Sequence, residues 1–270
     1  MSGQIDHYGG PVYLVLLFVG IFGLLVGSFL NVVAYRVPRG ESVVRPRSRC
    51  PGCGTEIGAR DNVPVLSWLL LRGRCRHCSE PISIRYPAVE LLTAVVFVVL
   101  TISIGITWEL PAYLYLGAVG VALAVIDLDT HKLPDVLTYP SMVVGGVLLL
   151  LPAIADGSWD AYLRALLGGL ALCAFYFVLV LIYPKGMGLG DVKLAAVLGL
   201  YLGWLGWSYV LIGGFLGFAL GALVSIPLML FKRAGRKTKI PFGPFMLAGA
   251  LIAIVWGSEI WDWYRGLLGV

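Results

Sequence analysis

Charged side chains are scarce in this sequence. Only 13% of its 270 residues are Asp, Glu, Lys or Arg, whereas 59% are hydrophobic and the mean hydropathy is +0.89. Because about a quarter of the residues in a soluble domain are charged, this composition excludes a soluble enzyme, a secreted disulfide scaffold and a disordered chain. The hydrophobic residues stand in continuous runs and not in short alternating segments, which argues against a transmembrane β-barrel.

The apolar runs predict an all-α polytopic membrane protein with about eight transmembrane helices, since a helix needs roughly 20 apolar residues to cross a bilayer. No Lys or Arg precedes the first run, and this run is too long for the apolar part of a signal peptide, so we expect a retained helix. The 35 glycines favour close packing between such helices. The expected spans are 12–35, 86–106, 110–126, 136–155, 161–183, 192–205, 207–231 and 242–257.

The basic residues predict an orientation in the membrane. Ten of the 20 Lys and Arg residues lie in 36–85 and five in 232–239, and loops rich in these residues usually stay in the cytoplasm. With the N-terminus outside, 18 of the 20 fall in cytoplasmic loops and their flanks, which leaves Arg164 and Arg265. The net charge of +5 can also indicate nucleic acid, but in so apolar a chain we expect a lipid bilayer as partner and no nucleic acid.

Four of the five cysteines form two CxxC pairs in the expected cytoplasmic loop 36–85. Cys50 and Cys53 are separated from Cys75 and Cys78 by 21 residues, close to the spacing of a zinc ribbon. A loop of about 50 residues buries little core, so a metal would supply folding energy. We expect a structural zinc and not two disulfides, because the cytoplasm is reducing. A filled four-thiolate shell has no open position for a reacting water.

Several acidic residues lie near the expected membrane boundary. Glu90 is just inside the second span, while Asp127 and Asp191 lie at the cytoplasmic ends of spans, where ionisable groups usually mark a functional site. Plain alternatives exist, because Asp191 or Asp135 can cap a helix and Asp129 can be an ordinary loop residue. Two adjacent carboxylates would support aspartic proteolysis, since one keeps its proton while the other activates water. The sequence leaves open whether Asp127 and Asp191 meet.

Further motifs accompany these residues along nearly the whole chain. In order they are Gly27-Ser-Phe-Leu-Asn-Val-Val-Ala-Tyr-Arg36, the four cysteines, Asp61-Asn-Val-Pro-Val-Leu-Ser-Trp68, Arg85-Tyr-Pro-Ala-Val-Glu90, the run from Asp127 to Asp135, and Gly188-Leu-Gly-Asp191. Together they resemble the motifs of the bacterial prepilin peptidases, also called type IV leader peptidases. Each motif is weak alone, and their order makes the match specific.

The resemblance implies eight transmembrane helices and a pair of catalytic aspartates that face the cytoplasm. By motif, the pair would be Asp127 and Asp191. Supporting roles would fall to residues in or next to the same two motifs: Asp129, Asp135, Gly188, Gly190 and Lys193.

The resemblance also implies two activities. Members of this family cut the basic leader from prepilins and pseudopilins on the cytoplasmic side, and many then methylate the new N-terminal residue with S-adenosylmethionine. The four-cysteine loop is a feature of the bifunctional members. The sequence has no Gly-rich dinucleotide-type fingerprint for the methyl donor, so the donor site is expected from the resemblance alone, with Asn31, Arg74 and Glu90 as weak candidates.

The expected organisation has three parts within a bacterial inner membrane. Residues 1–35 would form the first transmembrane helix, 36–85 the cytoplasmic zinc loop, and 86–270 a seven-helix aspartic peptidase domain. An alternative is an ion- or proton-coupled transporter with a zinc-stabilised loop, but the acidic residues cluster on one face and no inverted pair of broken helices is apparent. A membrane scaffold that docks a partner through its zinc loop would leave the two acidic motifs unexplained.

Overall fold

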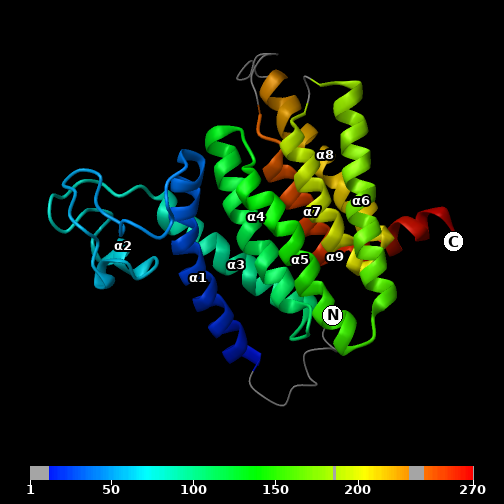
Figure 1. The fold of residues 1–270 in the computed structure, drawn as a ribbon, viewed down its shortest axis with the longest axis horizontal. Helices are drawn as coiled ribbons and strands as arrows, with labels where there is room; N and C mark the ends of the chain where they lie inside the picture. The colour runs from blue at the N-terminus through cyan, green and yellow to red at the C-terminus, as the bar shows by residue number, and fades with distance from the viewer. Residues whose placement is uncertain (1–11, 185–186, 231–239, 270) are drawn as a thin grey trace. The chain divides into compact units, whose positions relative to one another are not determined.

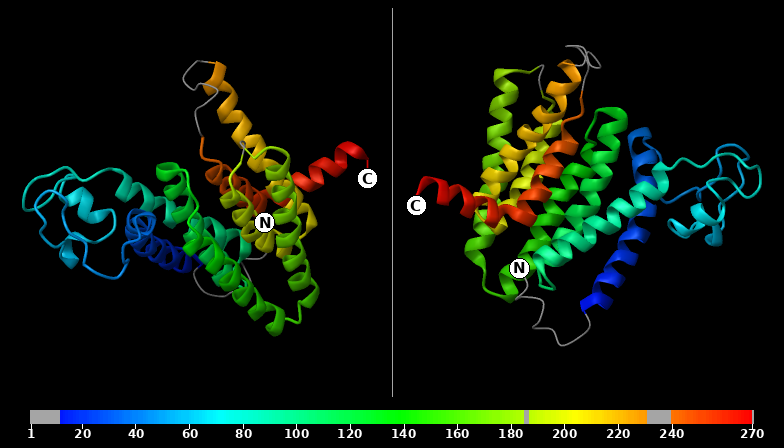
Figure 2. Two further views of the ribbon diagram at one scale, coloured as in Figure 1. Left: turned by 45° about the horizontal axis from the view of Figure 1, so that its top comes forward. Right: turned by 180° about the vertical axis from the view of Figure 1, so that it is seen from behind.

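The computed structural model describes residues 12–184, 187–230 and 240–269. These residues form nine α-helices and two short 3-10 turns, and no strand occurs among them (Figures 1 and 2). The helices are α1 Val12–Arg36, α2 Leu66–Leu70, α3 Arg85–Ile104, α4 Leu110–Thr130, α5 Asp135–Ala155, α6 Trp159–Ile182, α7 Leu189–Leu205, α8 Trp207–Leu230 and α9 Gly243–Leu268.

The eight long helices correspond to the eight predicted spans, and α2 is a short helix within the loop. Seven of them, in the part of the chain that the structure describes, are long and apolar enough to cross a membrane. The eighth, α7, has 17 residues, and its length of about 25 Å is just below the usual thickness of the hydrocarbon core. The chain is therefore a multi-pass membrane protein. Lys185 and the basic segment 232–239, which contribute to the predicted orientation, lie outside the described residues.

Two predicted helix ends are wrong. The third span continues to Thr130 instead of ending at 126, because the helix closes only at His131, which has a left-handed φ of 53° and donates its N–H to the Asp127 carbonyl. The last span continues to Leu268 instead of ending at 257. Polar residues follow position 257, but the helix continues through them and ends at Gly269 with a φ of 71°.

The chain forms two compact units. Unit 1 comprises the described residues up to Ile106 together with Gly117–Ala122, and unit 2 comprises Thr107–Leu116 and the described residues from Leu123 onward. The functional division at 35/36 and 85/86 stays a prediction.

In unit 1, glycines let α1 and α3 approach closely. A Cβ atom at Gly23 would lie 2.7 Å from the Ala94 Cα, and one at Gly27 would lie 2.7 Å from the Glu90 Cα. The two glycines are four residues apart, so they lie on one face of α1. This small-residue spacing brings two helix backbones together in a bilayer, where packing and not apolar burial drives association.

In unit 2, α7 is the central helix. It contacts α5, α6, α8 and α9, and 12 of its 17 residues are buried. The α6–α7 contact again depends on glycine, since a Cβ at Gly168 would lie 2.6 Å from the Gly199 carbonyl oxygen. An apolar surface on every side suits a helix that other helices surround. The start of α7, which carries Asp191, is thus held by its neighbours.

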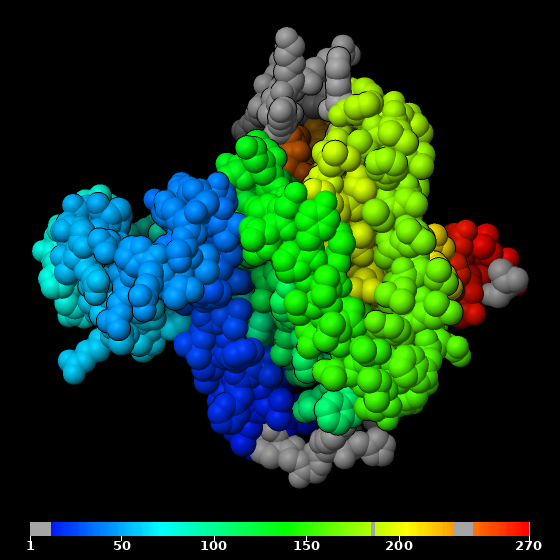
Figure 3. All heavy atoms as spheres, viewed as in Figure 1, coloured from blue at the N-terminus to red at the C-terminus, as the bar shows by residue number. Residues whose placement is uncertain are grey.

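The outer side chains of unit 2 are apolar. Large side chains of α5 and α6 form a broad surface in the space-filling view (Figure 3). Such exposed surface is unusual for a water-soluble protein and suits contact with lipid. Examples are Val136, Val143, Val147 and Leu151 of α5 and Leu163, Leu170, Phe177 and Leu181 of α6.

Candidate active site and metal centre

Asp127 lies in the last turn of α4 and is buried, with 5% of its surface exposed. Its Oδ2 atom accepts a hydrogen bond of 3.0 Å from the backbone N–H of Gly243, at the start of α9. The turn is closed by the Thr130 hydroxyl, which donates to the Ile126 carbonyl. The carboxylate therefore lies at a helix end, as predicted, although within the helix and not in the loop after it.

Asp191 is the third residue of α7 and is also buried. Its Oδ2 atom accepts a hydrogen bond of 3.0 Å from the N–H of Gly188, the N-cap residue. This is the carboxylate half of a capping box. Asp191 therefore helps to cap the helix, but from the third helical position and not as the N-cap itself.

Leu133, within the Asp127–Asp135 run, packs against the second acidic motif. A Cβ atom at Gly190 would lie 3.1 Å from the Leu133 Cβ, and one at Gly243 would lie 3.4 Å from its Cδ2. Leu133 thus contacts the starts of both α7 and α9. Through Leu133 and Gly243, the fold thus brings the Asp127 motif and the Asp191 motif together, which the sequence left open.

The two glycines of the Gly-x-Gly motif have different surroundings. Gly190 faces Leu133, where a Cβ would be tighter than an ordinary contact, whereas a Cβ at Gly188 would have 3.7 Å to its nearest neighbour, the Asp191 carboxylate. The Gly-x-Gly spacing predicts that another backbone approaches closely at this motif. The approach exists at Gly190, but the neighbour is a side chain.

Of the predicted supporting residues, Lys193 and Asp135 form an ion pair with 2.6 Å between Nζ and Oδ1. Asp135 is the first residue of α5 and follows the N-cap Pro134, so it joins α5 to α7 instead of serving as the N-cap. Asp129 is exposed on α4. It is two residues from Asp127, and residues at this spacing point to different sides of a helix.

Sequence reasoning missed Gly243, Leu133 and Tyr176. Tyr176 of α6 is buried and stacks on Phe218 at 5.2 Å between ring centroids. Gly243 was missed because it lay inside an expected span and no motif set it apart among the 35 glycines. A Gly-Pro pair at the start of the last span was the one local signal for it.

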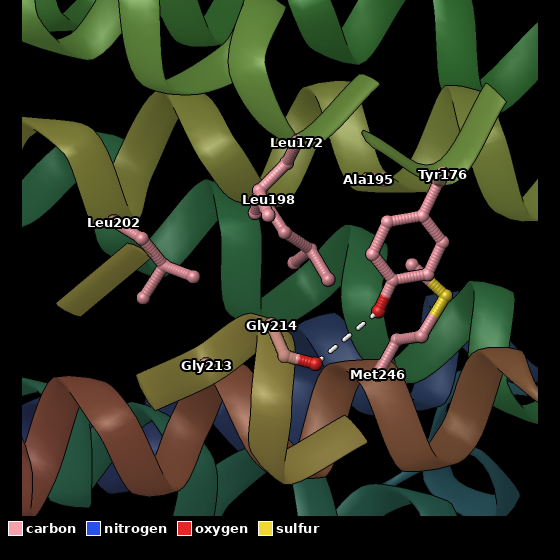
Figure 4. Close-up of a pocket in the computed structure, with 8 residues that line it drawn as sticks. All are labelled: Leu172, Tyr176, Ala195, Leu198, Leu202, Gly213, Gly214 and Met246. Carbon is pink, nitrogen blue, oxygen red and sulfur yellow. Dashed lines mark hydrogen bonds between the residues drawn. The ribbon is translucent and has the colours of Figure 1, made fainter. Parts of the chain in front are cut away.

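A pocket beside Tyr176 is too small for a substrate. Figure 4 shows it between α6, α7, α8 and α9, with the Tyr176 hydroxyl directed to the Gly214 carbonyl at 3.5 Å. Its volume of about 10 Å³ holds at most one water molecule. It is lined by Leu172, Tyr176, Ala195, Leu198, Leu202, Gly213, Gly214 and Met246.

The four cysteines of the loop form a second cluster, in unit 1. Their Sγ atoms all lie within 4.8 Å of one another, and those of Cys50 and Cys78 are 3.7 Å apart. In a tetrahedral site with Zn–S bonds of about 2.3 Å, the sulfur atoms are roughly 3.8 Å apart. All four are free cysteines, so the donor set and its spacing fit a metal ion.

The two CxxC turns have the same backbone hydrogen bonds. In each, the N–H of the first cysteine donates to the carbonyl five residues later, and its carbonyl accepts from the residue four positions later. The bonds are Cys50 N to Thr55 O at 2.9 Å, Gly54 N to Cys50 O at 2.9 Å, Cys75 N to Glu80 O at 2.8 Å and Ser79 N to Cys75 O at 3.0 Å. Both turns therefore present two sulfur atoms in the same way, as a four-sulfur site requires.

The chemistry of the loop suits a thiolate site. Hydrogen bonds to the hydroxyl and backbone N–H of Thr55 lower the pKa of Cys53 to about 6, and a metal ligand must be the thiolate. Nearby, Arg76 binds both carboxylate oxygens of Asp61, at 2.7 to 3.1 Å, and these bonds hold the pKa of Asp61 below its usual value. That pair connects the second cysteine turn to the Asp61–Trp68 motif.

The three weak candidates for a methyl-donor site all lie in unit 1. The Glu90 carboxylate accepts the Val65 N–H at 2.7 Å, and the Asn31 amide donates to the Tyr86 carbonyl at 3.1 Å. Arg74 is exposed beside Cys75. Glu90 and Asn31 thus have structural contacts, and a methyl-donor role for any of the three stays a prediction.

Comparison with known proteins covers both units. Residues 21–104 match the model of the bacterial peptidase A24 N-terminal domain, and residues 113–226 match that of the type IV leader peptidase family. Relatives named prepilin leader peptidase/N-methyltransferase are similar over most of their length. The protein from Aeromonas hydrophila is 40% identical over 94% of this chain and 95% of its own, and that from Pseudomonas aeruginosa is 35% identical over 92% and 93%.

A relative from Myxococcus xanthus with the same name is 44% identical over 87% of this chain and 69% of its own. No solved structure matches the chain. With identities of this size over nearly the whole sequence, and with both domain models matched in order, the chain belongs to the type IV leader peptidase family.

Proposed function

We propose that this protein is a membrane-embedded aspartic endopeptidase that removes the leader peptide of type IV prepilins or pseudopilins, with Asp127 and Asp191 as its catalytic pair. The observation that carries the proposal is that two separate motifs, each with a buried aspartate, come together around Leu133, at the end of α4 and the start of α7. The family membership supports the same activity.

The geometry suits aspartic chemistry. The ionised carboxylate removes a proton from a water molecule, whose oxygen bonds to the peptide carbonyl carbon, while the protonated one donates to the carbonyl oxygen. The C–N bond then breaks and the leaving nitrogen takes up a proton. In both aspartates a backbone N–H holds Oδ2, so the orientation of each Oδ1 is set without help from the substrate.

The substrate class suits the depth of the site. A prepilin carries a basic leader ahead of an apolar helix, so in a bilayer its scissile bond would lie at the cytoplasmic surface of the inner membrane. Asp127 and Asp191 lie at the ends of apolar helices, which supports a site at such a boundary. The transporter alternative receives no support from the relatives, since those compared are named peptidase/N-methyltransferase.

The second proposed activity is N-methylation of the new N-terminal residue, with S-adenosylmethionine as the methyl donor. The match of residues 21–104 to the bacterial N-terminal domain and the names of the relatives support it. We assign a structural zinc to Cys50, Cys53, Cys75 and Cys78, on the spacing of their sulfur atoms. A four-thiolate zinc would order the loop and would have no position for a reacting water.

The proposal predicts that Asp127→Asn and Asp191→Asn each abolish leader cleavage. Loss of a general acid or base costs about 10²- to 10⁴-fold in rate. A prepilin co-expressed with the full-length protein and analysed by mass spectrometry reports both leader removal and an added methyl group.

Asp160→Asn serves as the matched control, because this aspartate lies in the first turn of α6 and is exposed. We expect wild-type cleavage from it, and membrane insertion and zinc content unchanged in all three variants. Cleavage at more than about a tenth of the wild-type rate by either catalytic variant would remove that residue from the pair.

A further inference from the structure

The start of α9 directs one backbone N–H at Asp127. The first N–H groups of a helix have no partner within it. Here Pro244 has no N–H, and the N–H groups of Phe245 and Met246 donate to the Phe242 carbonyl. The Gly243 N–H instead bonds to Asp127 Oδ2 at 3.0 Å, across 116 residues of sequence.

Aromatic packing holds this N–H in place. Phe242, the N-cap residue of α9, packs its ring against Phe218 of α8 at 5.2 Å and near Tyr176 of α6 at 6.4 Å between centroids. Phe218 in turn stacks on Tyr176 at 5.2 Å. The position of Gly243 is therefore set by two neighbouring helices, so its N–H is a fixed donor.

Position 243 also has no room for a side chain. A Cβ atom there would lie 2.7 Å from Asp127 Oδ2 and 3.4 Å from its Cγ. The backbone at this position does not have the left-handed φ that favours glycine, so the requirement is one of space. Because the overlapping atom is the carboxylate oxygen itself, alanine at 243 would displace the group that hydrogen-bonds to the backbone.

We propose that Gly243 is a positioning residue for Asp127: its N–H fixes Oδ2, and its lack of a side chain leaves room for the carboxylate beside Leu133. The inference rests on the proposed peptidase function and adds the start of α9 as a third element of the site. Displacement of a catalytic group by about 1 Å can cost on the order of 10²-fold in rate.

The first test is the kinetics of prepilin cleavage by the full-length Gly243→Ala protein in lipid vesicles. We expect kcat to fall by about 100-fold, with KM within a few-fold of wild type because the change lies at the carboxylate. A KM rise with unchanged kcat, or wild-type values for both, would overturn the proposal.

A stability cycle tests the same contact without activity. Gly243→Ala should lower the melting temperature by several degrees, on the scale of a mutation in a domain of this size. In an Asp127→Ala background the overlapping carboxylate is gone, so the same substitution should cost little. This arm also applies if Gly243→Ala alone is too unstable for kinetics. Equal losses in both backgrounds would show that Gly243 does not act through Asp127.

Gly257→Ala is the matched control. It lies in the same helix, and its Cβ would meet the Tyr209 ring at 2.7 Å, away from either aspartate. We expect it to lower stability but to retain kcat within about threefold of wild type, whereas a 100-fold loss would show that any overlap in α9 stops cleavage.

The failure of this proposal can be told apart from the failure of the proposed function. If Asp127→Asn is active, the catalytic assignment is wrong. If Asp127→Asn is inactive and Gly243→Ala is fully active, only the role of Gly243 is wrong.

Discussion

Each acidic motif also supplies one partner of an ion pair. Asp135 follows Asp127 at the start of α5, Lys193 follows Asp191 on α7, and their side chains meet at 2.6 Å. The Lys193 ammonium also lies 4.8 Å from the centre of the Tyr139 ring. With 23% and 59% of the two side chains exposed, such a pair contributes about 0.2–1 kcal/mol. Its effect is to hold the starts of α5 and α7 in register.

We therefore expect Lys193→Met to lower kcat/KM for prepilin cleavage by no more than about fivefold, which corresponds to 1 kcal/mol. Asp135→Asn should have a similar effect, and the double variant should be no worse than either single one, because both remove the same interaction. Steady-state kinetics on the four proteins measure this. Losses that multiply in the double variant would show that the two residues act independently.

Among the helices, α7 is short but well anchored at both ends. At the C-terminal end of α7, the guanidinium of Arg164 on α6 donates to the carbonyls of Gly203 and Trp204 at 2.8 and 2.7 Å. Carbonyls in the last turn of a helix lack partners within it, and a cation stabilises that end. Arg164 is one of the two basic residues that the predicted orientation leaves outside the cytoplasm, and this contact gives it a structural role.

The four-cysteine loop, residues 36–85, has little regular secondary structure. It contains α2 and two 3-10 turns, and its cysteine turns are held by few backbone bonds. Glu90 on α3 anchors it by accepting the N–H of Val65, a residue with a strained φ of 58°. Folding energy for such a loop is expected to come from the metal.

Replacing Cys50 and Cys53 with Ser should thus reduce bound zinc from about one ion per chain to near zero. Trypsin should then cut at the arginines of residues 36–85 on the order of tenfold faster or more, because the loop unfolds without its metal. Metal analysis and limited proteolysis of the purified protein provide both readouts. Cys173→Ser, in α6, should leave the metal bound. Full zinc content in the double variant would contradict the site.

At the scale of the whole molecule, the distribution of charge predicts the topology. Loops on the two sides of the membrane differ in Lys and Arg content, with 10 of 20 in residues 36–85 alone. Insertion follows this bias. The turn between α5 and α6, at Gly157, should accordingly lie outside the cytoplasm, and the loop around Gly58 should lie inside.

An epitope inserted after Gly157 should bind antibody on intact spheroplasts, and one inserted after Gly58 should bind only after permeabilisation, with signals that differ on the order of tenfold. Both glycines have nothing within 4 Å of a Cβ atom, so insertions there should be tolerated. Cleavage of a co-expressed prepilin confirms that each tagged protein is active. Antibody access to the epitope at Gly58 in intact spheroplasts would show that the predicted orientation is wrong.

Much of this architecture could be predicted because its causes are local. A segment that crosses a bilayer must satisfy its own backbone hydrogen bonds, so a run of apolar residues implies a helix wherever it occurs. The CxxC spacing is likewise local, since each turn holds its sulfur atoms through bonds within six residues. The errors were at α4 and α9, where a helix continued through polar residues.

By itself, the sequence determined the class of the protein, its long helices and its two acidic motifs. Tertiary structure decided that the Asp127 and Asp191 motifs come together, with Leu133 between the starts of α7 and α9 and the Gly243 N–H on the Asp127 carboxylate. The physical reason is that apolar runs and motifs follow from neighbours along the chain. Contacts between helices depend on how their surfaces pack, and the partner of Asp127 lies 116 residues away.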